Sequence, residues 1–472
     1  MSTELWMKTA CEIADSLKSG EISQLDVLES LERRYFAVNP LVNALPTHCF
    51  ERARKAIKNS ANKPIAKQKP LFGLPIPIKD SYLVSGVRTT FGSLAFHNFI
   101  PEHSDLVTRT LEKSGGVIYA KSNTPEFEAG ASTFNDVFGI TRNPWNIKRS
   151  TAGSSGGAAA SVATGMAFIS QGSDFACSIR YPAAFCGIVG LRPTPGLVPQ
   201  GPNRLPYQNL SVIGPLARNI EDIGLAMDAM VAFDIQDPLT SPKLQVGYRA
   251  ATLSPKKPSK IGFSMDLGGL AIVSPEIKNM VSGSIALLEN EGVNINYSCP
   301  DMSQADQAFR PLRAAQFAGM WSHVLRTNKD LLKPEVVWNI EQGLNLTSSD
   351  ISGAELKRSK IRANILEYLK VNDFFILPAA PVVANLAEDR FVKEIDGVRM
   401  KDYLEWLLLG YTISLTGCPA ISIPCGFSSE GLPVGLQVVA GPYQEKKLLR
   451  LAAWLENVFE CRITTPIDPI CK

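Results

Sequence analysis

The stretch that decides the fold runs from Arg149 to Pro195 and reads RSTAGSSGGAAASVATGMAFISQGSDFACSIRYPAAFCGIVGLRPTP. It carries little charge and is rich in glycine, alanine and serine. Small residues let one backbone approach another backbone, or approach a ligand. Composition alone therefore leaves two interpretations open, a tightly packed structural segment and a ligand-binding loop.

The composition of the whole chain limits the classes of protein to which it can belong. The 472 residues are 45% apolar and 20% charged, enough to bury a large core. A net charge of +3 without a basic block argues against nucleic-acid binding. Nine cysteines without CxxC spacing, and only four scattered histidines, predict neither a metal site nor a disulfide framework. With no signal-peptide pattern at the N-terminus, we expect a cytoplasmic protein with reduced thiols.

One uncharged run, residues 406–429, is long enough to raise the question of a membrane span. It contains Pro419, Pro424 and several small polar residues. These residues favour a buried strand and turn, so we expect no membrane span.

The remaining patterns alternate between helix and strand along the chain, which predicts an α/β fold. Residues 4–37 read as two amphipathic helices, the lysine-rich residues 55–69 as a solvated loop, and 166–170 as a buried strand. We expect further strands at 260–265, 293–297, 374–378, 420–424 and 434–439, and helices at 275–291, 305–332, 351–370 and 445–458. Pro311 is expected to interrupt the helix at 305–332.

These elements predict one large domain, residues 1–472, with a central mixed β-sheet covered by helices on both faces. Within it we distinguish an N-terminal helical segment (about 4–60), a central part (about 70–235) and a C-terminal part (about 236–460). No internal repeat or change of composition marks a second domain.

A lysine ends the apolar, proline-rich segment Pro70-Leu-Phe-Gly-Leu-Pro-Ile-Pro-Ile-Lys-Asp80. The three prolines favour an extended strand at a sheet edge. Lys79 is then either a strand-end residue that reaches water or a desolvated functional amine.

Several motifs together resemble those of the amidase signature family. They include Gly73-Leu-Pro-Ile-Pro-Ile-Lys79, Ala152-Gly-Ser-Ser-Gly-Gly157 and Gly172-Ser-Asp-Phe-Ala-Cys-Ser-Ile-Arg-Tyr-Pro-Ala-Ala-Phe-Cys-Gly187. Others are Phe138–Trp145, Ile213–Arg218 and Gly431–Gln437. They follow the family order and extend the resemblance from about residue 8 to 458.

The resemblance implies a hydrolase that cleaves carboxamide C–N bonds through a serine acyl-enzyme. The residues at the family positions are Ser178 as nucleophile, Ser154, preceded by a cis peptide, as proton relay, and Lys79 as base. Because a serine hydroxyl is a weak nucleophile, a base must take its proton, and a lysine can do so only when neutral. The apolar run before Lys79 agrees with a dry site that lowers the lysine pKa. No cofactor is implied, and the partner is a small-molecule amide.

The same resemblance assigns supporting roles around the nucleophile. The backbone N–H groups of Phe175, Ala176, Cys177 and Ser178 occupy the family's oxyanion-hole position. Ser155 is expected to give hydrogen-bonding support, and Asp174 and Arg180 to order the loop. The family usually has Gly-Gly before the nucleophile, where this chain has Ala176-Cys177. If either position needs a positive φ, a β-carbon costs energy there, and the hole is reshaped or the site narrowed.

Other interpretations stay open at this point. Gly153-Ser-Ser-Gly-Gly157 formally fits the nucleophile motif of α/β-hydrolases, with Ser155 as nucleophile, although residues 143–150 before it make a poor strand. Cys177 could itself be the nucleophile. The chain could also be a non-catalytic or weakened amidase-like binding protein, because of Ala176-Cys177.

A further alternative within the family is the glutaminase subunit of a tRNA-dependent amidotransferase. Residues 315–345 lack the tyrosine- and glycine-rich character of that subunit, which favours a free-standing enzyme. The sequence identifies neither the substrate nor the oligomeric state, and it permits a homodimer. Aromatic residues at 305–325 and 400–412 are equally compatible with a substrate channel and with core packing.

Overall fold

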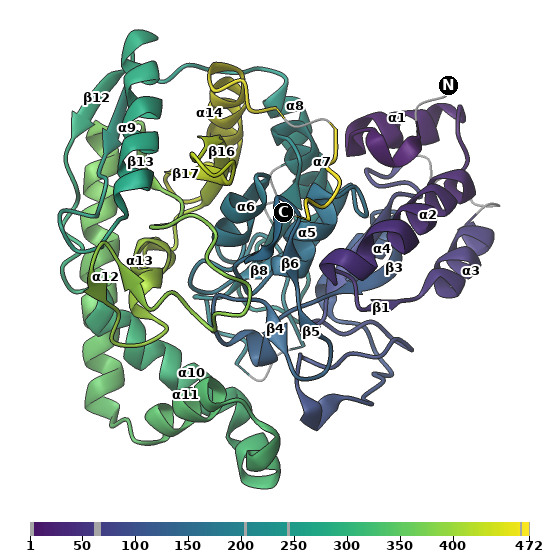
Figure 1. Ribbon diagram of the computed structural model, residues 1–472, viewed down its shortest axis with the longest axis horizontal. Helices are drawn as coiled ribbons and strands as arrows, with labels where there is room; N and C mark the ends of the chain where they lie inside the picture. Colours follow the sequence, from purple (N-terminus) through teal and green to yellow (C-terminus); the bar gives the residue numbers. More distant parts are fainter. Residues whose placement is uncertain (1–3, 61–67, 203–204, 243–245, 463–464, 472) are drawn as a thin grey trace.

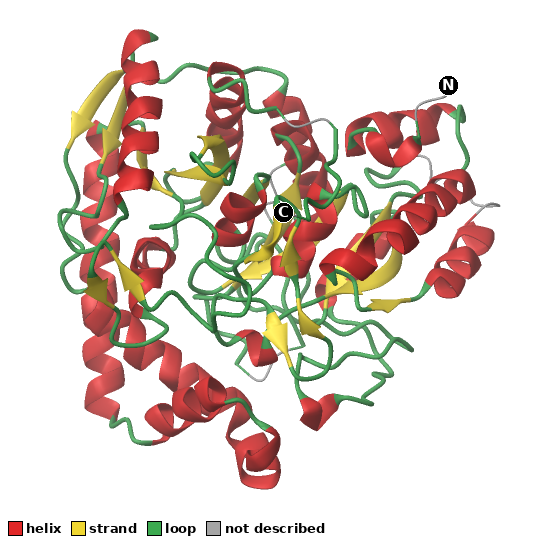
Figure 2. Ribbon diagram, in the orientation of Figure 1, coloured by secondary structure: helices red, strands yellow, loops and turns green. Residues whose placement is uncertain are grey.

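An eight-stranded mixed β-sheet organises the computed structural model (Figures 1 and 2), which describes residues 4–60, 68–202, 205–242, 246–462 and 465–471. In spatial order the strands are β12 (Asn294–Tyr297), β11 (Lys260–Phe263), β13 (Phe374–Pro378), β17 (Pro433–Val439), β16 (Ala420–Phe427), β9 (Val189–Arg192), β10 (Val212–Ala217) and β8 (Ile169–Asp174). β11 pairs in parallel with β12 and β13, and the other pairs are antiparallel. Every residue of β13 and β17 is buried, as expected for strands covered on both faces.

A second sheet of three strands, which we did not expect, lies beside the first. Its order is β1 (Thr47–His48), β3 (Val117–Ser122) and β2 (Pro75–Lys79), so β2 is an edge strand and tolerates its two prolines. β2 packs against β8, the last strand of the large sheet. The backbone N–H of Lys79 donates to Gln171 Oε1 of β8 at 3.0 Å. Lys79 therefore stands at the junction of the two sheets.

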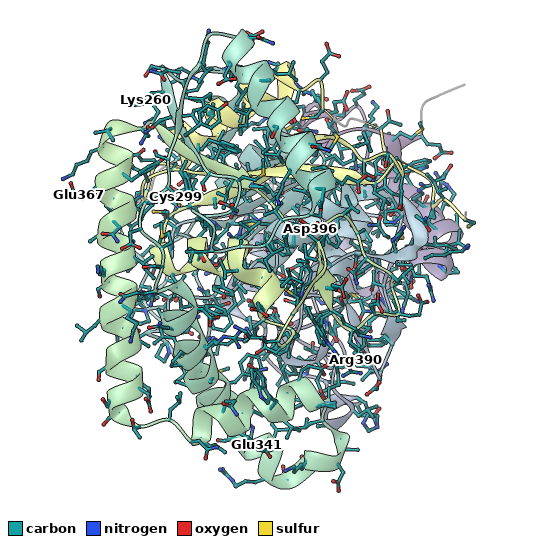
Figure 3. All side chains as sticks on the ribbon, turned by 60° about the vertical axis from the view of Figure 1, so that its left-hand side comes forward. Lys260, Cys299, Glu341, Glu367, Arg390 and Asp396 are labelled. Carbon is teal, nitrogen blue, oxygen red and sulfur yellow. The ribbon has the colours of Figure 1, made fainter. Side chains whose placement is uncertain are left out.

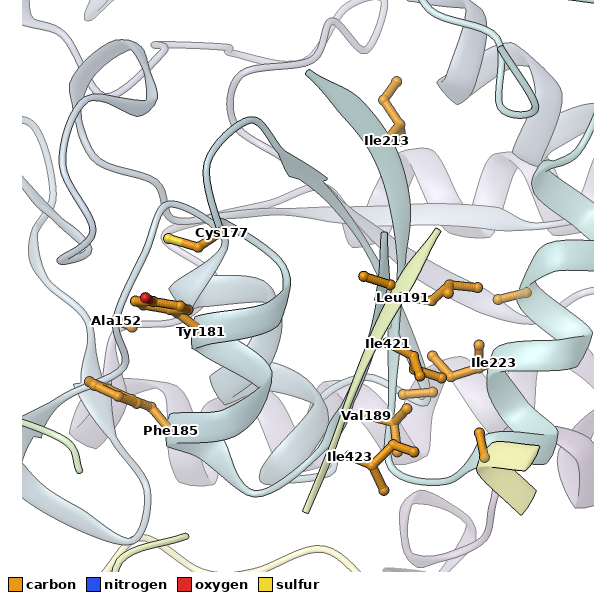
Figure 4. Packing of buried hydrophobic residues seen from close by; sticks show 14 of the residues in the cluster. Ala152, Cys177, Tyr181, Phe185, Val189, Leu191, Ile213, Ile223, Ile421 and Ile423 are labelled. Atoms are coloured by element: carbon orange, nitrogen blue, oxygen red, sulfur yellow. The ribbon is translucent and has the colours of Figure 1, made fainter. Parts of the chain in front are cut away.

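Helices cover both faces of the large sheet, as predicted. α6 (Arg180–Cys186) packs on one face of β9, β16 and β17, and α7 (Ile220–Met230) on the other face of β9 and β10. Figure 4 shows both layers, with Ile223 of α7 facing the apolar side chains of β9 and β16. α8 (Tyr248–Thr252), α9 (Pro275–Asn290) and α14 (Glu445–Val458) complete the packing around these strands and helices.

The glycine- and alanine-rich helix α5 (Gly156–Ala163) packs against β2, β3, β8 and β10. A β-carbon added at Gly157 would lie 2.3 Å from the backbone nitrogen of Asn123. The small residues at the start of α5 are therefore needed for close packing.

The N-terminal helices α1 (Ala10–Ser19), α2 (Gln24–Val42) and α3 (Phe50–Ser60) lie at the right of Figure 1. Thr9 and Ser23 cap α1 and α2 through capping boxes, so the predicted pair of helices is confirmed. α3 continues to Ser60, so the loop prediction is wrong for residues 55–60. Residues 61–67 of that predicted loop lie outside the described part of the chain.

The C-terminal helices α10 (Ala305–Asn328), α11 (Pro334–Leu344), α12 (Ser348–Val371) and α13 (Leu408–Thr416) pack beside the sheet. Glu367 projects outward from α12 (Figure 3). α10 is continuous through Pro311, so the predicted interruption is wrong. Residues 406–429 contain the helix α13 before the strand β16, where the sequence predicted a buried strand and turn. Among the helices of the described residues, none is long and apolar enough to cross a membrane.

The loops that surround the site contain short elements. α4 (Leu106–Lys113) precedes β3, and two hairpins follow it, β4 (Phe134–Asn135) with β5 (Gly139–Ile140) and β6 (Arg142–Asn143) with β7 (Asn146–Ser150). β14 (Glu394–Ile395) and β15 (Val398–Arg399) form a third. β7 corrects our expectation that residues 143–150 make a poor strand.

Candidate active site

Lys79 is fully buried at the end of β2, and its ammonium group meets three oxygen acceptors. Nζ lies 2.7 Å from Ser154 Oγ, 2.9 Å from Ser173 Oγ and 2.7 Å from Glu128 Oε1. Burial lowers the pKa of Lys79, and the neighbouring Glu128 carboxylate opposes this effect. Lys79 is thus a desolvated amine and does not reach water from the strand end.

Ser154 lies in the loop between β7 and α5, and the Gly153–Ser154 peptide bond is cis. The next residue connects this loop to the segment that contains Ser178, because the Ser155 N–H donates to the Ser178 carbonyl at 3.1 Å. The structure therefore brings Lys79 and Ser154 into direct contact and places Ser178 on the adjoining loop. Ser178 is 7% exposed, and its hydroxyl forms no hydrogen bond with another described residue.

The loop from Phe175 to Ser178 presents its backbone N–H groups without partners. None of the four N–H groups has an acceptor among the described residues, whereas the carbonyls of Asp174, Ala176, Cys177 and Ser178 all accept hydrogen bonds. Arg192 donates to the Asp174 carbonyl. Arg180 and Ser414 donate to the Ala176 carbonyl at 2.7 and 3.0 Å, and the Tyr181 N–H donates to the Cys177 carbonyl at 2.9 Å. Because the C=O and N–H of a trans peptide point in opposite directions, the following N–H groups face away from these partners.

Asp174 and Arg180 order this loop through a buried ion pair. Arg180 donates to both carboxylate oxygens of Asp174, at 2.8 and 3.0 Å, and the Ile179 N–H adds a bond at 3.1 Å. Burial would raise the pKa of Asp174, but the charges of Arg180 and Arg192 outweigh it and hold that pKa at about 2.

Ala176 and Cys177 fit the loop without left-handed backbone. Neither belongs to the described non-glycine residues that have a positive φ. Cys177 instead packs against Gly410 of α13, where an added β-carbon would lie 2.4 Å from the Cys177 Cβ. Burial raises the pKa of the Cys177 thiol, which disfavours the thiolate that a cysteine nucleophile needs. The strain that the sequence suggested for these two positions is absent.

Ser155 is buried behind the site. Its hydroxyl donates to the Ser173 carbonyl at 3.2 Å, and the Ser173 N–H donates back to it at 3.3 Å. Both bonds tie the Ser155 hydroxyl to the backbone of β8, and the side chain is fully buried.

A cavity of about 360 Å³ opens beside this constellation. Glu128 is among its lining residues, and the lining contains a group of aromatic side chains: Tyr82, Phe91, Phe96, Phe99, Phe127, Phe175, Phe317 and Trp321. Phe127 stacks on Trp321 with ring centroids 4.1 Å apart. Its ionisable lining residues, among those the structure describes, are Tyr82, Asp105, Glu128 and His323.

The aromatic residues at 305–325 and 400–412, which the sequence left open between a substrate channel and core packing, belong partly to the cavity and partly to the core. Phe317 and Trp321 line it, whereas Phe309 stacks on Tyr411 in the core at 4.3 Å, and Tyr403 and Trp406 are buried.

Comparison with known proteins decides the family. The family model described as Amidase matches residues 26–449. The chain belongs to the amidase signature family. It is therefore an amidohydrolase, and the family's fold excludes the α/β-hydrolase alternative.

Relatives of this amidase include two kinds of enzyme. The acylamidase of Rhodococcus erythropolis is 30% identical, with 98% of each chain covered. A glutamyl-tRNA(Gln) amidotransferase subunit of Moorella thermoacetica is 34% identical, with 97% of this chain and 98% of the relative covered. Among solved structures, 6-aminohexanoate cyclic dimer hydrolase with its substrate superposes with a TM-score of 0.86 at 25% identity, covering 97% and 98% of the chains. A bacterial aryl acylamidase shares the fold, with a TM-score of 0.88, 23% identity, and 98% and 99% coverage.

The sequence analysis of this amidase missed two residues that touch Lys79. Neither Ser173 nor Glu128 is among the site residues that the sequence predicts. Ser173 comes close to Lys79 through the packing of β2 on β8, and Glu128 does so through the turn η4 (Glu126–Glu128). For Glu128 the only signal in the sequence was that a carboxylate stands in the loop that begins at Asn123.

Proposed function

We propose that this amidase cleaves its substrate through an acyl-enzyme on Ser178. Ser154 relays the Ser178 proton to Lys79, and the freed oxygen attacks the carboxamide carbon. The Lys79 proton then returns through Ser154 to the leaving amine, and water repeats the cycle on the ester. The observation that carries the proposal is the 2.7 Å contact between Lys79 Nζ and Ser154 Oγ beside the loop of Ser178.

The unpartnered N–H groups of Phe175, Ala176, Cys177 and Ser178 support the oxyanion part of the proposal. Fixed backbone donors stabilise a developing negative charge without reorganising during the reaction. Arg180, Arg192 and Ser414 support this role because they hold the carbonyls of the loop on its other side.

We further propose that the substrate is an amide with an aryl or other bulky apolar group. The aromatic lining of the cavity favours such a group, which would stack between Phe127, Phe175 and Phe317. One relative is named an acylamidase. From that name we infer for this chain only that the bond it cleaves is an amide. All nine cysteines are unpaired, which supports a reducing, cytoplasmic location.

A second candidate is a glutaminase subunit, which the 34% identity to the amidotransferase relative favours. Glutamine carries an α-carboxylate that needs a cationic partner. No lysine or arginine stands among the described residues that line the cavity, so the free-standing enzyme is our preferred function.

The test is a panel of aryl, aliphatic and amino-acid amides, with glutamine included, assayed on the purified chain. We expect aryl amides to give the highest kcat/KM. Ser178→Ala should abolish turnover. In the control variant Ser155→Ala, a fluorophosphonate should still label Ser178. Lys79→Ala should lose about 10³-fold, since general-base catalysis is worth about 10²–10⁴. Glutamine turnover that appears only with a co-purified subunit would establish the second candidate, and Ser178→Ala with full activity would refute the acyl-enzyme. Light scattering of the same sample tests whether the chain forms a homodimer, which the sequence permits.

A further inference from the structure

Glu128 reaches Lys79 from an unusual backbone turn. It ends η4 (Glu126–Glu128), where Phe127 and Glu128 have φ values of 46° and 61°. Consecutive left-handed residues other than glycine are uncommon and unfavourable. The turn is fixed by bonds from the Phe127 N–H to the Phe91 carbonyl at 2.8 Å and from the Glu128 N–H to the Pro125 carbonyl at 2.9 Å. It directs a carboxylate from the cavity wall to the buried amine.

The hydrogen bonds around Lys79 account for all three protons of an ammonium group. Its acceptors are Ser154 Oγ, Ser173 Oγ and Glu128 Oε1. Ser173 donates its own proton to Glu128 Oε1 at 2.6 Å, so its oxygen is free to accept from Lys79. A neutral lysine, which the proposed mechanism needs, has only two protons and must instead accept the proton of Ser154. All three contacts suit an ammonium group, and the 2.7 Å contact with the Glu128 carboxylate favours this charged form, in which Nζ cannot accept the Ser154 proton.

The nearby charges make Glu128 the direct counter-ion of Lys79. Burial would raise the pKa of Glu128, but the charge and hydrogen bond of Lys79 lower it below the usual range. Asp174 also favours the charged lysine from a longer range, but it is already paired with Arg180 and Arg192. The other titratable groups that face this pair are Asp80, which pairs with Lys121, the Tyr82 phenol, Asp105, the Cys177 thiol and His323 across the cavity.

We propose that Glu128 is a positioning residue that holds Lys79 as an ammonium ion in the free enzyme and thereby sets the pH range of the amidase. This inference rests on the proposed role of Lys79 as base. The carboxylate stabilises the charged lysine, so Lys79 loses its proton at a higher pH than burial alone would require. The rate rises with pH as Nζ becomes neutral and able to accept the Ser154 proton.

The test measures the rate constant of Ser178 labelling by a fluorophosphonate between pH 5 and 10 in the full-length protein. In Glu128→Gln the lysine loses its counter-ion, so the midpoint of the rise should move to lower pH by about 1–3 units, the effect of an opposite charge at this range. In Glu128→Asp the carboxylate is retained but shortened, and the midpoint should lie between those of the wild type and Glu128→Gln. Ser173→Ala removes a neutral partner only and should move the midpoint less than Glu128→Gln.

Glu126→Gln is the matched control, the same substitution two residues away in the same turn. Glu126 accepts from Ser93 Oγ and the Lys333 N–H and does not touch Lys79, so its midpoint should equal that of the wild type. A folded Glu128→Gln enzyme with the wild-type midpoint, or an equal shift in Glu126→Gln, would overturn the inference. If Glu128→Gln does not fold, Glu128→Asp decides, and an unmoved midpoint there overturns it too. A wild-type enzyme that is never labelled at Ser178 would refute the proposed function instead.

Discussion

Gly410→Ala tests whether α13 positions the oxyanion loop. The new β-carbon would lie 2.4 Å from the Cys177 Cβ and 2.8 Å from the Ala176 carbonyl oxygen. Ordinary carbon contacts are about 3.5–4 Å, so the loop must move by roughly 1 Å. A displacement of about that size can cost ~10²-fold in rate, and loss of one oxyanion donor costs about 10²–10³-fold. We expect kcat to fall by about 10²-fold, with a smaller change in KM.

The assay is steady-state hydrolysis of the best aryl amide, with thermal unfolding measured in parallel. Overpacking should destabilise the fold by about 1–3 kcal/mol. Gly283→Ala is the matched control, because it lies within α9 and no atom stands within 4 Å of its added β-carbon, so it should keep full activity. Adding Cys177→Gly to Gly410→Ala removes the closest clash and should restore part of kcat. A folded Gly410→Ala enzyme with kcat within about twofold of the wild type would refute this reasoning.

Two further predictions concern the same loop. From the sequence alone, replacing Ala176 and Cys177 by glycine is expected to improve activity or broaden the substrate range. In the structure, however, neither residue has a left-handed backbone conformation that glycine would relieve. The Cys177 side chain also fills the space beside Gly410. The double glycine variant should therefore unfold at a lower temperature and show no gain in kcat, and a clear gain in kcat would mean that the wild-type hole is misaligned. Asp174 has a pKa of about 2 against an ordinary 3.8, so its ionised form stabilises the fold above about pH 4, and this contribution, about 2 kcal/mol, is lost as pH falls towards 2. Urea unfolding at pH 5, 4, 3 and 2 measures this change in the free energy of unfolding. Asp174→Asn should be less stable than the wild type at pH 5 and should lose less stability on acidification. If the pH dependence of that variant equals that of the wild type, the assignment is wrong.

Apolar elements were the most predictable part of the fold. The strand at 374–378 and the helix at 445–458 have the predicted bounds, because their patterns are apolar or amphipathic throughout. The strand predicted at 166–170 lies instead at Ile169–Asp174. Its second half is polar, and those side chains are buried because Gln171, Ser173 and Asp174 find partners on other elements.

Pro311 does not interrupt its helix, although proline is unfavourable in the interior of a helix. Proline removes only one hydrogen bond from a helix, and packing of the long helix α10 against α11 and α12 maintains its path.

The sequence predicted only those site residues that lie in motifs of the family. Lys79 and Ser154, which are 75 positions apart in the chain, were paired by the family resemblance, and they are in contact in the structure. Glu128 belongs to no motif that we recognised, and its contact with Lys79 depends on a left-handed turn that its residue types do not favour. The cavity was equally hidden, because Phe91, Phe127, Phe317 and Trp321 come from three separate segments.

The position of Lys79 at the seam between two separately hydrogen-bonded sheets has a consequence for the order in which the molecule loses structure. Lys79 belongs to the three-stranded sheet, whereas Ser173 belongs to the edge of the large sheet. Cooperative units of a protein can open locally at a lower free energy than global unfolding. Undocking of the three-stranded sheet from β8 would separate the amine from Ser173 while the large sheet stays paired. Mild denaturant should therefore abolish catalysis before amide protons of β13, β16 and β17 exchange with solvent.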